Sequence, residues 1–301
     1  MAEKKMDSST SHRVISSCSN PAIVETRKLT QRKHRERTDC FLVEGPQVLS
    51  LALAGIHQTR SRSHIQPRSL FYANELVDRE SVALLESLTR AGGAAIAVTT
   101  EVLDSLSLRE HARGIVATFC LSRLAYTLAE VLPNMDEEPQ HADLLLVLDG
   151  IQDPGNLGAL IRTADAAGVR GVVLLGPCVD AFDGKTVRGT MGSIFTVPIV
   201  RLNDPAELVG ALATRGYRLI GADPHGEESL WSESRLAGRT AIFLGSEAHG
   251  LRPQVKSLLE ARVRIPMRGQ TESLNVATAG AILIYEWLRR QTAPAQPSRS
   301  G

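Results

Sequence analysis

Polar side chains that can bind a ligand follow three short apolar runs in the second half of the chain. These side chains are Asn156, Arg162, Glu247, Ser273 and Asn275. Amides, a hydroxyl and a carboxylate orient a polar substrate through hydrogen bonds, and a guanidinium stabilises negative charge. Open α/β sheets bind ligands at the carboxyl ends of their strands. The pattern therefore predicts a ligand site there, in either a nucleotide-cofactor enzyme or a non-catalytic RNA-binding protein.

Some of these residues also have a purely structural explanation. Asn156 stands where a helix N-cap is expected, and Ser273 can cap the last helix. Arg162 precedes Asp165 by three residues, which allows an ion pair on a helix surface. Each residue alone is ambiguous, but three such turns in one domain favour a shared site.

Two nucleotide-binding motifs are incomplete. The stretch 183–186 ends like a phosphate loop, but Val179 stands where that loop requires glycine. A dinucleotide fingerprint fails because Asp153 replaces its first glycine, which leaves NAD-linked oxidoreduction a weak alternative. His249 is isolated at a turn, and the sequence has no zinc-like spacing, so we expect no metal.

The composition limits the class of protein. The net charge of +1 means that affinity for nucleic acid must come from a local patch. The four cysteines are far apart, which is typical of reduced thiols in a cytoplasmic protein. No apolar run approaches the length of about 20 residues that spans a membrane, so we expect no membrane partner.

Strands and helices alternate in two blocks separated by a charged, proline-bounded stretch. We expect a disordered tail (1–19), a small α/β domain (20–121), a linker (122–142), a mostly parallel α/β domain (143–291) and a second disordered tail (292–301). The strands expected in the larger domain are 144–148, 171–175, 196–199, 217–222, 241–244 and 262–265. Its expected helices are 156–167, 185–192, 205–215, 252–259 and 274–290.

The first domain opens with a helix whose later turns are basic. We expect it to contact RNA phosphates through Arg27, Lys28, Arg32, Lys33, Arg35 and Arg37. A solvated basic helix is the alternative.

Four stretches of the second half occur in a recognisable order. They are NLGALIRTADAAGV, RGTMGSIFTVPI, FLGSEAHGL and IPMRGQTESLNVATAGAILIYEW. Together they resemble the motifs of the SpoU/TrmH family of RNA ribose 2′-O-methyltransferases, which belongs to the SPOUT class. The stretch RKLTQRKHRERTDCFLVEGPQVL is similar to the L30e-like substrate-binding domain of many members.

The resemblance implies a fold, a cofactor and an assembly. The fold is an α/β sheet whose C-terminal segment is threaded as a deep trefoil knot, an exception to the rule against knots. The cofactor is S-adenosylmethionine, and members are homodimers with the site near the subunit interface. The extra N-terminal domain favours rRNA as substrate. A tRNA 2′-O-methyltransferase and a non-catalytic RNA-binding or ribosome assembly factor are the alternatives.

The resemblance also assigns roles to residues. It implies that the cofactor is held near Leu244, Gly245, Gly250, Ile265, Met267 and Leu274. Asn156, Arg162, Glu247, Ser273 and Asn275 match the family's polar site residues. Because arginine is essentially always protonated, we expect Arg162 to hold a phosphate and stabilise the forming oxyanion rather than act as a simple base. The chemistry requires no metal, since the leaving group is a neutral thioether.

Overall fold

The computed structural model describes residues 14–57, 65–109, 111–134, 142–232 and 236–292. The chain divides into two compact units, Met1–Leu121 and Ser122–Gly301. Within the described ranges, no helix is long and apolar enough to cross a membrane. The expected tail 292–301 lies outside these ranges apart from Thr292, which ends the last helix.

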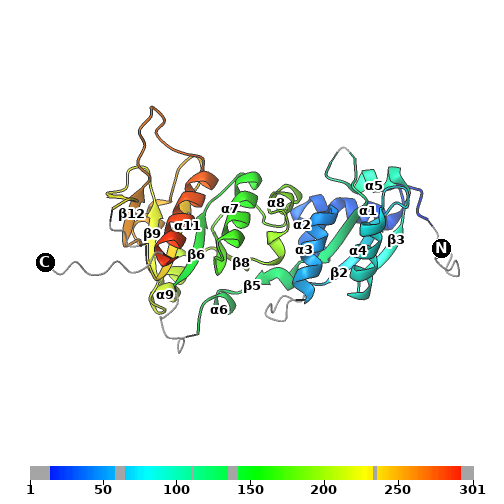
Figure 1. The fold of residues 1–301 in the computed structure, drawn as a ribbon, viewed down its shortest axis with the longest axis horizontal. Helices are drawn as coiled ribbons and strands as arrows, with labels where there is room; N and C mark the ends of the chain where they lie inside the picture. Colours follow the sequence, from blue (N-terminus) through cyan, green and yellow to red (C-terminus); the bar gives the residue numbers. More distant parts are fainter. Residues whose placement is uncertain (1–13, 58–64, 110, 135–141, 233–235, 293–301) are drawn as a thin grey trace. The chain divides into compact units, whose positions relative to one another are not determined.

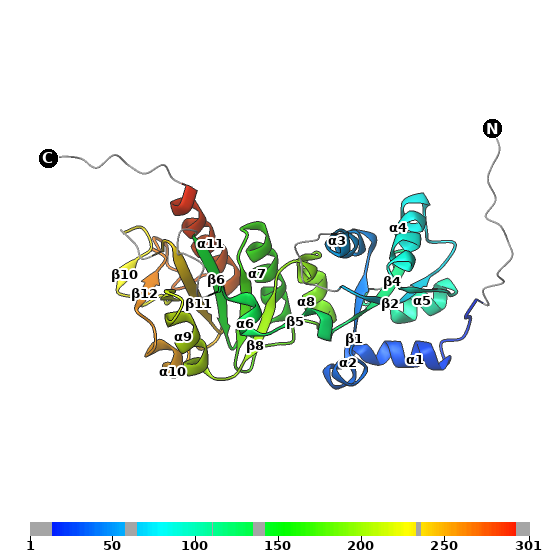
Figure 2. The same ribbon diagram turned by 90° about the horizontal axis from the view of Figure 1, so that it is seen from below.

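The first unit is a four-stranded mixed sheet in the order β1-β4-β2-β3 with helices on both faces (Figure 2). Strand β4 is antiparallel to β1 and β2, whereas β2 and β3 are parallel. One face packs Leu42, Phe71 and Val116 against α1, η1 and α5. The elements are α1 (Pro21–Arg27), η1 (Lys28–Thr30), α2 (Arg32–Thr38), β1 (Cys40–Glu44), α3 (Pro46–His57), β2 (Pro67–Tyr72), α4 (Arg79–Arg90), β3 (Ala94–Ala97), α5 (Thr100–Leu106) and β4 (Ile115–Cys120).

The second unit is built on an eight-stranded sheet in the order β10-β12-β9-β11-β6-β7-β8-β5. Every pairing in this sheet is parallel. Its elements are η2 (Ser122–Leu124), β5 (Ala125–Tyr126), α6 (Leu128–Val131), β6 (Asp143–Asp149), α7 (Pro154–Ala166), β7 (Gly171–Leu175), α8 (Gly184–Gly189), η3 (Ser193–Phe195), β8 (Ile199–Leu202), α9 (Pro205–Ala213), β9 (Arg218–Ala222), β10 (Glu228–Ser229), β11 (Arg239–Gly245), α10 (Pro253–Lys256), β12 (Ala261–Arg264) and α11 (Val276–Thr292). The predicted α/β class with a parallel sheet is confirmed.

Helices cover both faces of this sheet. Helices α7 and α11 pack side by side on one face, and α9 and α10 lie on the other (Figures 1 and 2). Strand β6 is buried along its whole length, because it has a neighbouring strand on each side and helices above and below. The face below α9 and α10 includes Leu145, Val147, Ala241 and Phe243. This core fixes the carboxyl ends of β6 and β11, where the predicted site lies.

The structure differs from the sequence-based expectations at several boundaries. Ile15 forms a parallel bridge to Val98, so the expected tail 1–19 is ordered from Val14 onward where it is described. The expected linker 122–142 contains β5, which pairs with β8 and so belongs to the second sheet. The expected strand 196–199 is instead β8, because the 3-10 helix η3 occupies the chain just before it. A short apolar run does not reveal such shifts of two or three residues.

The expected basic helix is also broken in two. Gln31 has an extended backbone between η1 and α2, with φ −96° and ψ 128°. The guanidinium of Arg35 folds back and donates hydrogen bonds to the carbonyls of Leu29, at 2.8 Å, and Thr30, at 3.0 Å. Arg35 is only 2% exposed, so it satisfies the backbone of this break and is not available to RNA. The predicted RNA-binding role of Arg35 is therefore withdrawn.

Helices α7 and α8 approach each other at backbone distance, which gives a test of the packing that supports the site. A Cβ added at Gly158 would lie 2.9 Å from both the Cα of Gly189 and the carbonyl oxygen of Thr186. We expect Gly158→Ala to lower the free energy of unfolding by about 1–3 kcal/mol through overpacking, measured by urea denaturation. Gly210→Ala in α9 is the control, because it has open space around it and gains helix propensity. Equal stability of the Gly158 variant and wild type would contradict this account.

Candidate active site

The carboxyl edge of the parallel sheet carries a cavity of about 580 Å³. Its walls come from the loops that follow β9, β11 and β12 and from the start of α11. The structure brings the predicted cofactor-binding residues together around this one cavity: Leu244, Gly245, Gly250, Ile265, Met267 and Leu274 all line it. Glu247, Ser273 and Asn275 line it as well. The volume lies within the range usual for small-molecule sites.

The wall after β11 depends on two glycines. A Cβ at Gly245 would lie 2.0 Å from the carbonyl carbon of Gly250, so the chain touches itself at backbone distance. Ser246 and Gly250 exchange backbone hydrogen bonds of 2.9 and 3.1 Å, and Gly250 has φ +66°. Any side chain at Gly245 would force this loop open and change the shape of the cavity.

Hydrogen bonds join three separate loops at the edge of the cavity. The Asn156 Nδ2 donates to Glu247 Oε1 at 2.8 Å, and Asn275 Nδ2 donates to Asn156 Oδ1 at 2.9 Å. Glu247 also accepts hydrogen bonds from the backbone N–H groups of Gln152 and Asp153, at 3.3 and 3.4 Å. Burial acts to raise the pKa of Glu247, but the hydrogen bonds from Asn156 and the backbone outweigh it and hold the pKa below its usual value.

The helix caps are not the residues expected. Asp153 caps α7 by accepting the N–H of Asn156 at 2.8 Å, with Pro154 at the first helical position. Asn275 Oδ1 accepts the N–H groups of Ala277 and Thr278 and so begins α11. The capping explanations of Asn156 and Ser273 are therefore wrong. Asn156 is left to connect loops through its side chain, and Ser273 is exposed at the cavity.

Arg162 stands apart from this cavity. It is exposed on α7 and does not line the pocket, and the described residues give its guanidinium no hydrogen bond or ion pair. Arg162 lies six positions after Asn156 along α7, which gives a rise of about 9 Å and a rotation of about 240° between them. The suggested partner Asp165 instead accepts a hydrogen bond from Thr196 at 2.8 Å. The site of one chain therefore lacks the predicted cation.

Sequence reasoning missed two groups that shape the site. Asp149, fully buried at the end of β6, accepts both the backbone N–H (2.8 Å) and the Nε (2.5 Å) of Arg252, which holds the far end of the β11 loop. Asp223 lines the cavity and pairs with Lys256 at 3.1 Å. Burial raises the pKa of Asp223, but its hydrogen bonds and cationic neighbours bring it below the usual value. Their only signal in the sequence was an acidic residue at the end of an apolar strand.

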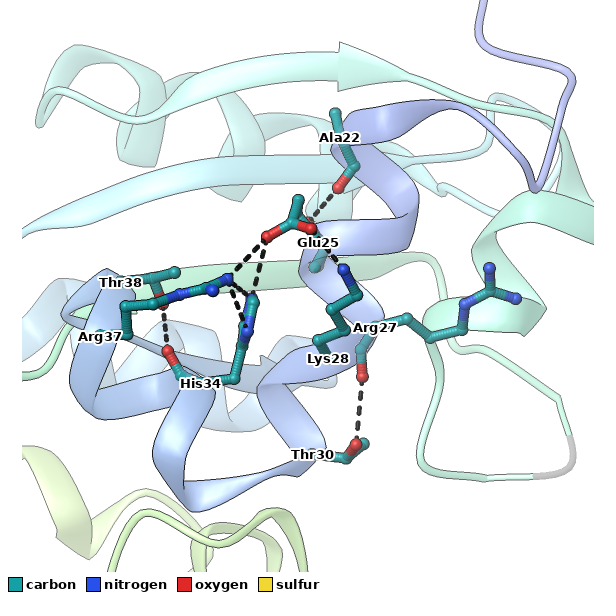
Figure 3. A network of polar contacts seen from close by, with 9 residues as sticks. Ala22, Glu25, Arg27, Lys28, Thr30, His34, Arg37 and Thr38 are labelled. Atoms are coloured by element: carbon teal, nitrogen blue, oxygen red, sulfur yellow. Dashed lines mark hydrogen bonds and ion pairs between the residues drawn. The ribbon is translucent and has the colours of Figure 1, made fainter.

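Two of the predicted RNA-binding residues of the first unit, Lys28 and Arg37, lie around the carboxylate of Glu25 (Figure 3). The carboxylate of Glu25 pairs with Lys28 at 2.6 Å, Arg37 at 3.2 Å and His34 at 3.1 Å. The hydrogen bond from Lys28 holds the pKa of Glu25 below its usual value. Arg27, Lys28, Arg32, Lys33 and Arg37 are all exposed. Five cations along α1, η1 and α2 therefore face solvent, and three of them, Lys28, Arg32 and Arg37, pair with Glu25 or Glu36.

The described residues contain no group of three or more His, Cys, Asp or Glu side chains placed to hold a metal ion.

A parallel sheet with a ligand-sized cavity at its carboxyl edge, formed by loops far apart in the sequence, defines a class of α/β enzymes that bind a small cofactor there.

Comparison with known proteins specifies this class. Residues 143–285 match the SpoU rRNA Methylase family, and residues 20–117 match an MRM3-like substrate binding domain. The chain is 34% identical to an uncharacterized tRNA/rRNA methyltransferase of Synechocystis sp., over 94% of this chain and 96% of that one. It is 31% identical to a 23S rRNA guanosine 2′-O-methyltransferase of Bacillus subtilis, over 90% of this chain and 97% of that one.

A solved structure agrees with this result. The AdoMet-bound rRNA methyltransferase of Sinorhizobium meliloti superposes with a TM-score of 0.78 and 29% sequence identity, covering 94% of this chain and 99% of that chain. The chain therefore belongs to the SpoU rRNA methylase family. The family resemblance found in the sequence is confirmed.

The lowered pKa of Glu247 predicts a pH-dependent contribution of this carboxylate. Its stabilising effect is fully present above the pKa of the unfolded chain and is lost as the pH falls through the lower folded value. We expect Glu247→Gln to lower the free energy of unfolding at pH 7 by less than about 1 kcal/mol, because the side chain is exposed. The melting temperature should therefore fall slightly at pH 7 and stay unchanged at pH 3. Its methyl-transfer rate should fall about tenfold at pH 7 through lost orientation of Asn156.

The control for this experiment is Glu272→Gln. Glu272 is exposed and lines the same cavity, but the described part of the chain provides it with no hydrogen bond. Its substitution should leave the melting temperature at pH 7 unchanged. A Glu247 variant whose stability tracks wild type from pH 7 to pH 3 would contradict the proposed network.

Proposed function

We propose that this chain transfers the methyl group of S-adenosylmethionine to a ribose 2′-hydroxyl in large-subunit ribosomal RNA. The observation that carries the proposal is the cavity at the carboxyl edge, where Glu247, Ser273 and Asn275 meet the backbone of the β11 loop. The 23S rRNA 2′-O-methyltransferases among the relatives support the choice of substrate. Incubation with tritiated cofactor and 23S rRNA, followed by mapping of 2′-O-methyl sites, tests it directly.

The cavity suits this cofactor in size and in chemistry. Leu244, Ile265 and Leu274 offer an apolar surface for a purine, while Ser246 and Asp223 offer polar groups for a ribose or an amino-acid moiety. When bound, S-adenosylmethionine supplies an electrophilic methyl on a sulfonium. We assign its binding to the backbone near Leu244, Gly245, Gly250, Ile265, Met267 and Leu274, of which Met267 is 38% exposed.

The polar residues act on the incoming sugar. A ribose hydroxyl is a poor nucleophile, so the site must align it and stabilise the negative charge that develops on its oxygen. We assign the alignment to Ser273 and Asn275, both exposed at the cavity, with Asn156 and Glu247 fixing the amide of Asn275. The guanidinium of Arg162 supplies the positive charge and holds the adjoining phosphate.

We propose that the protein is a homodimer in which Arg162 serves the partner's cavity. The exposed position of Arg162, away from the cavity of its own chain, supports this arrangement. The neighbouring helix α11 presents Tyr285, which is 49% exposed, on its outer side together with Thr278 and Ile282. This partly exposed face of α11, which packs beside α7, is suited to packing against a second copy about a two-fold axis.

We further propose that the segment from β11 to α11 is threaded as the family's deep trefoil knot. Helix α11 returns to pack on both α7 and β11, and Gly280 allows it to touch Leu160 and Leu244 closely, which supports such threading.

A ribosomal RNA substrate and four cysteine thiols support a cytoplasmic location.

Arg162→Ala tests the assigned chemistry. We expect calorimetry to show nearly unchanged binding of S-adenosylmethionine, because Arg162 is assigned to the RNA phosphate and not to the cofactor. Turnover on 23S rRNA should fall by about 10²-fold or more through lost stabilisation of the oxyanion. Arg162→Lys, which keeps the charge but loses the fork of donors, should retain part of the activity. Near-normal turnover of the alanine variant would remove Arg162 from the mechanism.

A mixture of inactive variants tests the dimer. Subunits carrying Arg162→Ala and subunits carrying Asn275→Ala should each be inactive alone. After exchange they should regain about a quarter of wild-type activity, because half of the dimers are hybrids and each hybrid holds one complete site. If Arg162 serves its own chain, the mixture stays inactive.

We propose that the exposed cations around Glu25 bind RNA phosphates. The match of residues 20–117 to a substrate-binding domain supports this assignment. Pairing with Glu25 and Glu36 already orders Lys28, Arg32 and Arg37, so RNA binding costs these side chains less conformational entropy.

Charge neutralisation tests this surface. We expect the triple variant Arg32→Gln, Lys33→Gln, Arg37→Gln to bind RNA about tenfold more weakly at 0.1 M salt. The slope of the logarithm of the binding constant against the logarithm of the salt concentration should become shallower by about two. The matched control neutralises Arg79, Arg90 and Arg109, three exposed arginines elsewhere in the same unit. Equal losses in both variants, measured by filter binding at several salt concentrations, would reject a specific role for the cluster.

A further inference from the structure

Two cysteines of the first unit lie directly opposite each other on neighbouring strands. Cys40, the first residue of β1, pairs with Cys120, the last residue of β4, in an antiparallel ladder. Opposite residues of such a pair point to the same face of the sheet. Both are thiols in the structure, Cys40 partly exposed and Cys120 buried.

The hydrogen bonds of the ladder identify the type of pair. The backbone N–H of Leu121 donates to the backbone carbonyl of Asp39 at 3.0 Å, and the backbone N–H of Gly45 donates to the backbone carbonyl of Ile115 at 3.4 Å. Hydrogen-bonded pairs alternate with non-hydrogen-bonded pairs along an antiparallel ladder, so the Cys40–Cys120 pair is non-hydrogen-bonded. Consistently, the N–H of Cys120 points away from β1 and donates to Gln66 at 2.9 Å.

This position suits a disulfide. In non-hydrogen-bonded pairs the Cα atoms are about 4.5 Å apart, within the range that disulfides span. The two thiols also share polar neighbours. The Sγ of Cys120 donates to Asp39 Oδ2 at 2.9 Å, and Arg68 Nη2 lies 3.8 Å from the same sulfur. Burial raises the pKa of the Cys40 thiol, and the charge of Arg68 opposes this.

We propose that Cys40 and Cys120 form a reversible intramolecular disulfide on exposure to a hydroperoxide. The Cys40 thiolate attacks a peroxide oxygen, the O–O bond breaks, and one water and a Cys40 sulfenic acid form. The Cys120 thiol then gives its proton to Asp39, and its thiolate attacks the Cys40 sulfur and displaces hydroxide, which leaves as water once protonated. In total two thiols and one hydrogen peroxide yield one disulfide and two waters.

The bond would join the start of β1 to the end of β4. Asp39 alone separates Cys40 from the basic helix α2, and it adopts a left-handed conformation with φ 52°. Cys120 immediately precedes Leu121, the last residue of the first unit. Oxidation would therefore fix one end of the cationic segment to the strand that leaves this unit. The formation of the disulfide does not depend on the proposed RNA-binding role.

Peptide mapping tests the proposal on the full-length protein. After treatment with hydrogen peroxide, alkylation and trypsin, we expect peptides 38–60 and 114–123 to be found linked, with a mass about 2 Da below their sum. Dithiothreitol should release them. The oxidised protein should also melt several degrees higher than the reduced one, because the bond closes a long loop of the unfolded chain.

Single substitutions provide the controls. Cys40→Ser and Cys120→Ser should each abolish the linked peptide and the peroxide-induced rise in melting temperature, whereas Cys18→Ser and Cys178→Ser should preserve both. Should Cys40 and Cys120 both remain alkylatable after peroxide, or should Cys40 accumulate as sulfinic acid without the linked peptide, the proposal is overturned.

Discussion

The cavity depends above all on the carboxylate of Glu247, which accepts the amide of Asn156 and two backbone N–H groups of the loop after β6. This one side chain ties the loop after β11 to the loop after β6. Asn275 extends the connection to the start of α11. A charged acceptor makes stronger hydrogen bonds than a neutral one, so the three segments are held although the site is open to solvent. The shape of the cavity then follows from their relative positions.

Backbone contacts complete what these hydrogen bonds begin. The chain after β11 can fold back on itself only because Gly245 has no Cβ, and α7 meets α8 at Gly158 and Gly189 for the same reason. Buried Asp149 grips the backbone and side chain of Arg252 and so fixes the far side of the same loop. A buried carboxylate is tolerated there because its partner and hydrogen bonds offset the cost of removing it from water.

The exposed cations around Glu25 and the cavity belong to different units of the chain. The net charge of the chain is close to zero, so attraction to phosphate must be local. The first unit concentrates exposed cations around Glu25, while the second unit carries the cavity. Arg162 is exposed on α7, apart from the cavity of its own chain. This separation is the physical reason for the proposal that a complete site requires two chains.

The sequence by itself determined the fold class, the family and most of the residues that line the cavity, because apolar runs, turn residues and ordered motifs are local signals. It did not reveal that Arg162 lies apart from the cavity or that Asp223 lines it. It did not determine the roles of Asn156 and Asn275, since a cap and a link between loops require the same residue type. Nor did it separate Arg35, which closes a break in the backbone, from the exposed cations beside it. Only the tertiary structure decided these points, because they depend on which groups from distant segments come within hydrogen-bonding distance.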